Sequence, residues 1–220
     1  MQLMELIGRL LRRLKRELAH YHPRAFRSRR ALAERDARYD DAHGVDTGGD
    51  IDLKGLAISS PNRRFGTKYS AIPPEEFARG MTALSIQHED FTFIDFGSGK
   101  GRALLLAADF PFRKLIGIEF ARELHEAAAT NLRNRSNVQL LCMDVLEFEF
   151  PQDPLVVFLY NPFGPEIITQ VAHRLYSSSA ANRRPVYVLY LNPFHVDPWL
   201  LAGFRVLRRG DLFVILCPQQ

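Results

Sequence analysis

From residue 91 onward, short apolar runs alternate with segments in which apolar and polar residues are mixed. The apolar runs are rich in β-branched and aromatic residues and predict strands, whereas the mixed segments predict helices. Strands are expected at 91–96, 114–120, 138–148, 154–163 and 185–194, and helices at 72–84, 101–110, 121–135 and 165–179. The chain closes with "FRVLRRGDLFVILCP" (204–218), two strand-like runs joined by a Gly-Asp turn.

The repeated alternation of strands and helices indicates an α/β fold class. Strands that are apolar throughout must be covered on both faces, which is typical of a mainly parallel sheet with helices on either side. The Gly-Asp turn near the end predicts an antiparallel hairpin at one edge of the sheet. We therefore expect a Rossmann-like domain over residues 73–220.

The first 38 residues predict a basic helical extension. Within 2–20, leucine and isoleucine recur at helical spacing with arginine and lysine between them, as in an amphipathic helix. The leucines could pack on the domain or on a partner subunit, and the basic side could contact nucleic acid or an anionic membrane surface. An Arg-rich transit peptide is a further alternative, although serine is scarce. The pattern leaves these alternatives open.

Residues 39–72 form a second segment of distinct composition. They are rich in glycine and aspartate and show little periodicity, which predicts a loop with short pieces of regular structure. A long Gly-rich loop can serve as a lid over a ligand or as a solvated connector. Both interpretations fit this segment.

Composition limits the class of protein. A chain of 220 residues with 46% hydrophobic residues can bury the core of one ordinary domain. The net charge of +4 is concentrated near the start, because residues 1–40 hold 11 of the 29 Lys and Arg but 5 of the 25 Asp and Glu. No apolar run approaches the roughly 20 residues of a membrane-spanning helix, and no secretory signal is recognisable. We expect a soluble, cytoplasmic protein whose Cys142 and Cys217 are reduced core thiols.

A glycine-rich stretch, "DFGSGKGR" (95–102), lies where the first strand of the domain turns into a helix. A phosphate-binding Walker loop would need glycine at Ile94, so its spacing excludes that loop. A dinucleotide fingerprint would need glycine at Arg102, which weakens that interpretation. Lys100 and Arg102 are either solvated or face an acidic group. The pattern that is left is an acid followed by three alternating glycines: Asp95, Gly97, Gly99 and Gly101.

The chemistry of S-adenosylmethionine explains an acid in this position. Its amino-acid moiety carries an ammonium group that needs an acceptor, while glycines let the ligand approach the main chain. A carboxylate at the end of the second strand, Glu119, is placed for the ribose hydroxyls, and Asp144 at the third strand end for the adenine amino group. Each acid alone could instead be an ordinary cap or turn residue.

In order and spacing, "DFGSGKGR", "GIEF" and "MDV" resemble class I S-adenosylmethionine-dependent methyltransferases over residues 66–220. The resemblance implies a seven-stranded sheet with an antiparallel last strand and S-adenosylmethionine as the cofactor. It also implies a set of cofactor-binding residues: Asp95, Gly97, Ser98, Gly99 and Gly101 around the methionine part, Glu119 at the ribose, Phe120 on one adenine face, Asp144 with Val145 at the adenine edge, and in addition Phe96.

The stretch "GTKYSAIPPEEF" (66–77) is similar to the element that precedes the glycine loop in non-SET histone-lysine methyltransferases and some related bacterial enzymes. A tyrosine near this position borders the cofactor there, which makes Tyr69 a candidate cofactor-binding residue. The alternative is an ordinary packed aromatic side chain.

Two strands end in the same tripeptide, Asn-Pro-Phe, at residues 161–163 and 192–194. The first copy resembles the Asn/Asp-Pro-Pro-aromatic motif of methyltransferases that modify amino groups of bases or protein amides, although here the aromatic residue follows a single proline. It is also similar to the Asn-rich turn of the non-SET lysine enzymes. Asn161, Pro162 and Phe163 are therefore the catalytic candidates, with Asn161 also near the cofactor, and a plain strand-to-helix turn is the alternative.

The second copy, at the end of the fifth strand, is expected to be a capping turn, although Phe194 or His195 could touch a substrate. The seven histidines are scattered, so no metal site is predicted. The sequence predicts a methyltransferase acting on a nitrogen nucleophile of a protein or nucleic acid. An O- or C-methyltransferase of a small molecule, or a cofactor-sensing binding module without catalysis, are the alternatives.

Overall fold

The computed structural model describes residues 29–219, so the basic helix predicted at 2–20 lies outside the described residues. Its centre is a seven-stranded sheet in the order β5-β4-β3-β6-β7-β9-β8. The strands are β3 (Thr92–Phe96), β4 (Lys114–Glu119), β5 (Val138–Cys142), β6 (Leu155–Tyr160), β7 (Val186–Leu191), β8 (Phe204–Arg209) and β9 (Phe213–Pro218). In this sheet β9 alone runs against its neighbours, paired antiparallel to β7 and β8. The predicted seven-stranded sheet with an antiparallel last strand is confirmed.

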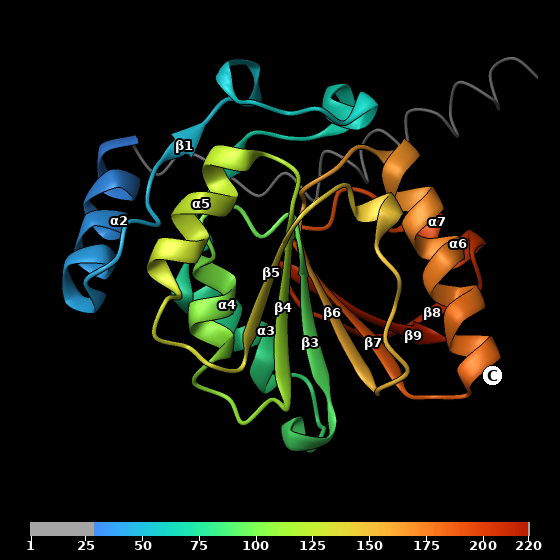
Figure 1. Ribbon diagram of the computed structural model, residues 1–220. Helices are drawn as coiled ribbons and strands as arrows, with labels where there is room; N and C mark the ends of the chain where they lie inside the picture. Colours follow the sequence, from blue (N-terminus) through green and yellow to red (C-terminus); the bar gives the residue numbers. More distant parts are fainter. Residues whose placement is uncertain (1–28, 220) are drawn as a thin grey trace, which may run out of the picture.

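Helices cover both faces of the sheet, as the apolar strands predicted (Figure 1). One face packs against α6 (Pro165–Asn182) and α7 (Asp197–Leu201), and its core includes Ile94, Ile118 and Val157. The other face packs against α3 (Pro74–Thr82), α4 (Arg102–Ala107) and α5 (Arg122–Asn131). The central strands are buried along almost their whole length because apolar side chains meet helices on both sides.

The edge strand β5 corrects one prediction. Its side chains are half-buried or exposed and none is fully buried, since only one neighbouring strand protects it. Cys142 ends this strand and is exposed, whereas Cys217 in β9 is buried. Both cysteines are free thiols, but the expectation that both lie in the core is wrong for Cys142.

A third group of elements lies beside and above this sheet. Helix α2 (Arg29–His43) continues past residue 38 and lies on the side of α4 and α5 (Figure 1). It is followed by β1 (Asp50–Ile51), the 3-10 turns η2 (Leu53–Gly55) and η3 (Pro61–Phe65), and β2 (Tyr69–Ser70), which pairs antiparallel with β1. A further turn, η5 (Val145–Glu147), follows β5. None of the helices within residues 29–219 has the length and apolar character needed to span a bilayer.

Candidate functional site

The glycine loop, residues 97–101, joins β3 to α4 at the carboxyl ends of the parallel strands. Gly97 and Gly99 adopt φ values of 74° and 53°, which side-chain-bearing residues rarely occupy. A Cβ on Gly97 would lie 2.5 Å from Cβ of Pro162, and one on Gly99 would lie 2.2 Å from the ring of Tyr69. The loop therefore brings the predicted glycines, Tyr69 and the first Asn-Pro-Phe turn into direct contact.

Two buried carboxyl groups lie beside this loop. Asp95, on β3, is 3% exposed, and burial, reinforced by the nearby charge of Glu119, raises its pKa well above the usual range. Glu119 ends β4, and its carboxylate accepts hydrogen bonds from the backbone N–H groups of Gly99 and Ala121, both at 2.9 Å. Burial raises the pKa of Glu119 as well, and these N–H donors offset part of the shift.

Asp95 lacks such compensation. Within residues 29–219 the structure shows no hydrogen bond or ion pair to its carboxylate. A buried carboxylate is costly unless a cation or several donors face it. The Asp95 position is therefore suited to a positively charged ligand group.

Two adjoining cavities, of about 60 Å³ and about 20 Å³, open at these carboxyl ends and share Gly97, Phe120 and Phe163. Most predicted site residues line them: Tyr69, Asp95, Gly97, Ser98, Glu119, Phe120, Pro162 and Phe163 the first, and Gly97, Phe120, Asp144, Val145 and Phe163 the second. Four predicted residues, Phe96, Gly99, Gly101 and Asn161, line neither cavity. Phe96 packs near Phe148 and Phe150 in the core.

Gly101 has a packing reason of its own. Its φ is 86°, and a Cβ there would lie 2.8 Å from Cδ1 of Leu132, just beyond α5. The third glycine of the pattern thus allows a close approach between two parts of the fold. Its predicted part in cofactor binding stays a prediction.

Asn161 begins the first Asn-Pro-Phe turn with φ of 50°, and Asn192 begins the second with φ of 49°. The same left-handed turn is therefore used twice. Oδ1 of Asn161 accepts a hydrogen bond from the hydroxyl of Tyr190 at 3.0 Å, and its backbone carbonyl accepts one from Thr67 Oγ1 at 2.8 Å. Asn161 is thereby held by Tyr190 and Thr67, directly before Pro162, which lines the first cavity.

The segment 53–70, called here the covering segment, closes over both cavities. The backbone N–H of Thr67 donates to the carbonyl of Pro162 at 2.9 Å, and Gly66 pairs with Phe163 in an antiparallel bridge. Asp144 accepts hydrogen bonds from Ser60 Oγ and from Asn62 Nδ2 of this segment. Both cavities are smaller than the roughly 300–1,000 Å³ usual for ligand pockets, because this segment lies so close.

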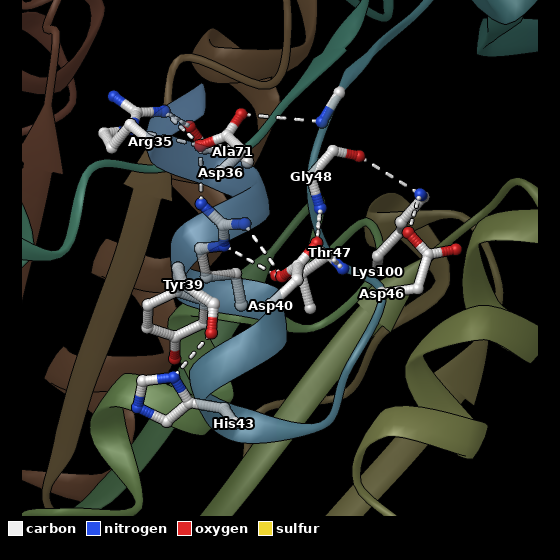
Figure 2. A network of polar contacts seen from close by, with 12 residues as sticks. Arg35, Asp36, Tyr39, Asp40, His43, Asp46, Thr47, Gly48, Ala71 and Lys100 are labelled. Atoms are coloured by element: carbon white, nitrogen blue, oxygen red, sulfur yellow. Dashed lines mark hydrogen bonds and ion pairs between the residues drawn. The ribbon is translucent and has the colours of Figure 1, made fainter. Parts of the chain in front are cut away.

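Arg102 anchors helix α2 to the glycine loop. It is 2% exposed, and its guanidinium lies 2.8 Å from Oδ1 of Asp36 and 3.0 Å from Oδ1 of Asp40, while its Nε donates to Thr47 Oγ1 at 2.6 Å. Figure 2 shows Asp36, Asp40 and Thr47 within the surrounding polar network. We call these contacts the Arg102 network.

The Arg102 network extends to two neighbours. The hydroxyl of Tyr69 donates to the carbonyl of Thr47. Lys100 Nζ lies 2.8 Å from Asp46 Oδ1, as Figure 2 shows. Of the two alternatives for Lys100 and Arg102, the structure therefore shows the acidic partners for both. The network ties the loop after α2 to Tyr69, which in turn contacts Gly99.

Several lining residues were not predicted. Thr67, Lys68, Ser70, Arg102 and Tyr160 all border the first cavity. Tyr160 directly precedes Asn161 at the end of β6, so its position next to a candidate was a signal that could have found it. Burial raises the pKa of the Tyr160 hydroxyl, which keeps it protonated. Within residues 29–219, no group of three or more His, Cys, Asp or Glu side chains could hold a metal ion.

The chain has the class I methyltransferase fold, the fold of the solved structures that it resembles. Mitomycin 7-O-methyltransferase MmcR is 16% identical with a TM-score of 0.51, over 67% of this chain and 54% of that enzyme. An RNA methyltransferase from Salinibacter ruber in complex with S-adenosyl-L-homocysteine is 18% identical with a TM-score of 0.50, over 68% of this chain and 94% of that one.

A predicted N6-adenine-specific DNA methylase from Listeria monocytogenes is 16% identical with a TM-score of 0.52, over 67% of this chain and 51% of that one. The chain thus spans about half the length of this protein and of the mitomycin enzyme. No protein-family model and no curated protein sequence matches the chain. At these sequence identities the likeness concerns the fold alone. The names of the three proteins give different methyl acceptors: mitomycin, RNA and DNA.

Proposed function

We propose that the chain is an S-adenosylmethionine-dependent methyltransferase that methylates a nitrogen nucleophile. The observation that carries this proposal is the contact between the glycine loop and the first Asn-Pro-Phe turn, beside a buried carboxyl that has no hydrogen-bond or ion-pair partner within residues 29–219. Gly97 faces Pro162 so closely that a Cβ would come within 2.5 Å of the proline ring, and Asp95 lines the same cavity. A cofactor-binding element and an acceptor-binding element would then share one cavity.

The donor groups at this cavity fit S-adenosylmethionine. Asp95 would balance the ammonium group of its methionine part, because that carboxyl is buried without a partner among the described residues. Glu119 would face the ribose hydroxyls, Phe120 would pack on the adenine ring, and Asp144 with Val145 would lie at the adenine edge. When bound, this cofactor supplies a methyl group on a positively charged sulfur atom.

The covering segment must move outward for such a ligand to enter. Ser60 and Asn62, both in this segment, donate hydrogen bonds to Asp144. The two cavities together are smaller than a cofactor needs. The segment then acts as the lid that the composition of residues 39–72 suggested. Closing it would exclude water from the reacting groups.

Methyl transfer to nitrogen needs a neutral amine held in line with the methyl group. A hydrogen-bond acceptor on the amine N–H directs its lone pair. Oδ1 of Asn161 has one lone pair engaged by Tyr190 and a second one left for this purpose. Phe163 offers an apolar wall at the cavity, and Pro162 fixes the turn against Gly97.

Isothermal titration calorimetry with S-adenosylmethionine tests the cofactor part. The wild-type chain should bind, and Asp95→Ala should lose most of the affinity. Asp109→Ala changes an exposed acid two residues beyond the end of α4 and should bind like the wild type. Absence of binding up to about 1 mM cofactor would end the proposal.

The nitrogen assignment has a separate test in the transfer rate. Asn161→Ala should reduce transfer strongly while leaving cofactor affinity within a few-fold. A rate that is unaffected by Asn161→Ala would favour methylation of oxygen or carbon in a small molecule. Cofactor binding without transfer to any acceptor would favour a cofactor-sensing module.

A further inference from the structure

The hydroxyl of Tyr190 joins the two Asn-Pro-Phe turns. Tyr190 lies on β7 and is 0% exposed. It donates to Oδ1 of Asn161 at 3.0 Å, and it accepts from the backbone N–H groups of Phe194 and His195. One buried hydroxyl thus connects the candidate transfer residue to the second turn.

A separate cavity of about 220 Å³ opens at this second turn. It lies between the end of β7 and the connection from β8 to β9. Its polar and aromatic lining comes from Asn192, Phe194, His195, Arg209, Asp211 and Phe213. The ends of β7 and β8 point to the same edge of the sheet as the ends of β3, β4 and β6, because these strands run parallel. The cavity therefore opens on the same side of the molecule as the candidate methyl-transfer site.

The lining combines an aromatic face with groups that can read a nucleobase. Phe194 is 49% exposed, so part of its ring is accessible at the surface, and the ring lies 6.5 Å from that of His195. Exposed aromatic rings stack on unpaired bases, and guanidinium, carboxylate and amide groups bind base edges. Arg209 forms no ion pair within residues 29–219, so its guanidinium is available for such a contact.

The distance between the two sites suits neighbouring units of one polymer. Strand β7 lies directly beside β6, and β9 follows it. Adjacent strands are about 4.8 Å apart, so the second cavity begins roughly 5–10 Å from the first turn. We propose that this cavity binds a nucleobase of a single-stranded nucleic acid next to the methylated one. The inference rests on the proposed function and narrows its acceptor to nucleic acid.

Binding of a fluorescein-labelled single-stranded RNA of mixed sequence to the full chain, followed by fluorescence anisotropy, tests this directly. Phe194→Ala should weaken binding about 5- to 150-fold, the range expected for loss of one stacked base. Arg209→Gln should weaken it as well. Phe194 and Arg209 are exposed, so both variants should fold.

Two matched controls are available. Leu201→Ala removes an apolar side chain that is 82% exposed on α7 and does not line the cavity. Arg205→Gln removes an exposed arginine from the other end of the same strand, β8. Both should bind the RNA within about twofold of the wild type, as expected for surface changes away from the site.

Equal RNA affinity of Phe194→Ala and wild type would overturn the inference, as would equal losses in Leu201→Ala and Phe194→Ala. Methyl transfer into protein alone would also overturn it, while leaving the methyltransferase proposal intact. Calorimetry with S-adenosylmethionine involves no RNA and tests the proposed function separately. If that function is wrong, calorimetry will show no cofactor binding, whatever the RNA measurement gives.

Discussion

The guanidinium of Arg102 lies 2.8 Å from the carboxylate of Asp36, and both side chains are almost completely buried. This pair connects the first residue of α4, directly after the glycine loop, to a helix more than sixty residues earlier in the chain. Asp40 and Thr47 complete the contacts, and the ring of Tyr39 lies 4.5 Å from the guanidinium carbon. Helix α2 is thereby an integral part of the fold that supports the site.

Arg102→Ala should destabilise the protein severely. Removing one partner of a buried ion pair leaves an uncompensated charge and costs about 3–5 kcal/mol. Thermal unfolding should show a Tm lower by roughly 10 °C, since a chain of this size shifts by about 2–4 °C per kcal/mol. Arg113→Ala breaks an exposed pair with Asp153 and should cost about 0–1 kcal/mol. Similar losses in both variants would contradict the structural role given to Arg102.

Asp95→Asn should have opposite effects on the stability of the cofactor-free protein and on its affinity for the cofactor. The folded-state pKa of Asp95 lies above its ordinary value near 3.8, so the folded protein favours the neutral acid. Its contribution to stability is complete below about pH 4 and is lost as pH rises through the folded pKa. At neutral pH, Asp95→Asn should therefore raise the Tm of the cofactor-free protein and abolish cofactor binding.

Asp109→Asn, on the surface, serves as the control and should change neither property. Differential scanning calorimetry between pH 4 and pH 8 measures the stability part. A gap between Asp95→Asn and wild type that shrinks as the pH rises would contradict the burial of an uncompensated carboxyl.

The glycine at position 99 is required by both conformation and space. Gly99→Ala would put a side chain at φ of 53° and 2.2 Å from the Tyr69 ring, so it should lower stability and cofactor affinity together. Gly44 shares a positive φ of 64°, but a Cβ added there would meet no atom of residues 29–219 within 4 Å. Gly44→Ala should therefore cost only about 1–2 kcal/mol of backbone strain.

A double variant isolates the steric part of that effect. Adding Tyr69→Ala to Gly99→Ala should recover some of the lost stability in chemical denaturation, because the clash is removed while the strain is kept. Strictly additive losses would show that the ring of Tyr69 does not pack against the loop.

Tyr190→Phe should reveal whether Asn161 is held for catalysis. Loss of the hydrogen bond to Oδ1 should lower kcat about tenfold, the upper range for one neutral hydrogen bond, with little change in KM for the acceptor. Tyr187→Phe on the same strand is the control, since its ring packs near Phe91 and its hydroxyl has no hydrogen bond within the described chain. A lower Tm with unchanged kcat would assign Tyr190 to folding alone.

The sheet and the glycine loop could be predicted because their signals are local. Apolar runs identified the five consecutive parallel strands, β3 to β7, and the terminal hairpin, and the acids at the strand ends followed directly from them. Parallel strands bring their carboxyl ends to one edge, so Asp95 and Glu119 had to lie close together. The place of Gly97 could be predicted as well, because it directly follows β3 at this same edge.

The packing of α2 could not be predicted, because its principal buried contact is polar. Its only fully buried side chain among residues 31–43 is that of Asp36, and no apolar stripe marks the face that meets the domain. The hydrogen bond from Tyr190 to Asn161 joins two neighbouring strands, and the two residues are 29 positions apart in the sequence. Contacts of this kind depend on strand order and register, which the pattern along one chain does not contain.

The most direct measurement of the central claim is transfer of a tritiated methyl group from S-adenosylmethionine into a fractionated lysate. For the wild-type chain we expect label in a macromolecular fraction, with the RNA fraction dominant. We expect no label with Asp95→Ala and undiminished label with Asp109→Ala. Absence of label in every fraction from a folded wild-type protein, or equal label with Asp95→Ala, would contradict it.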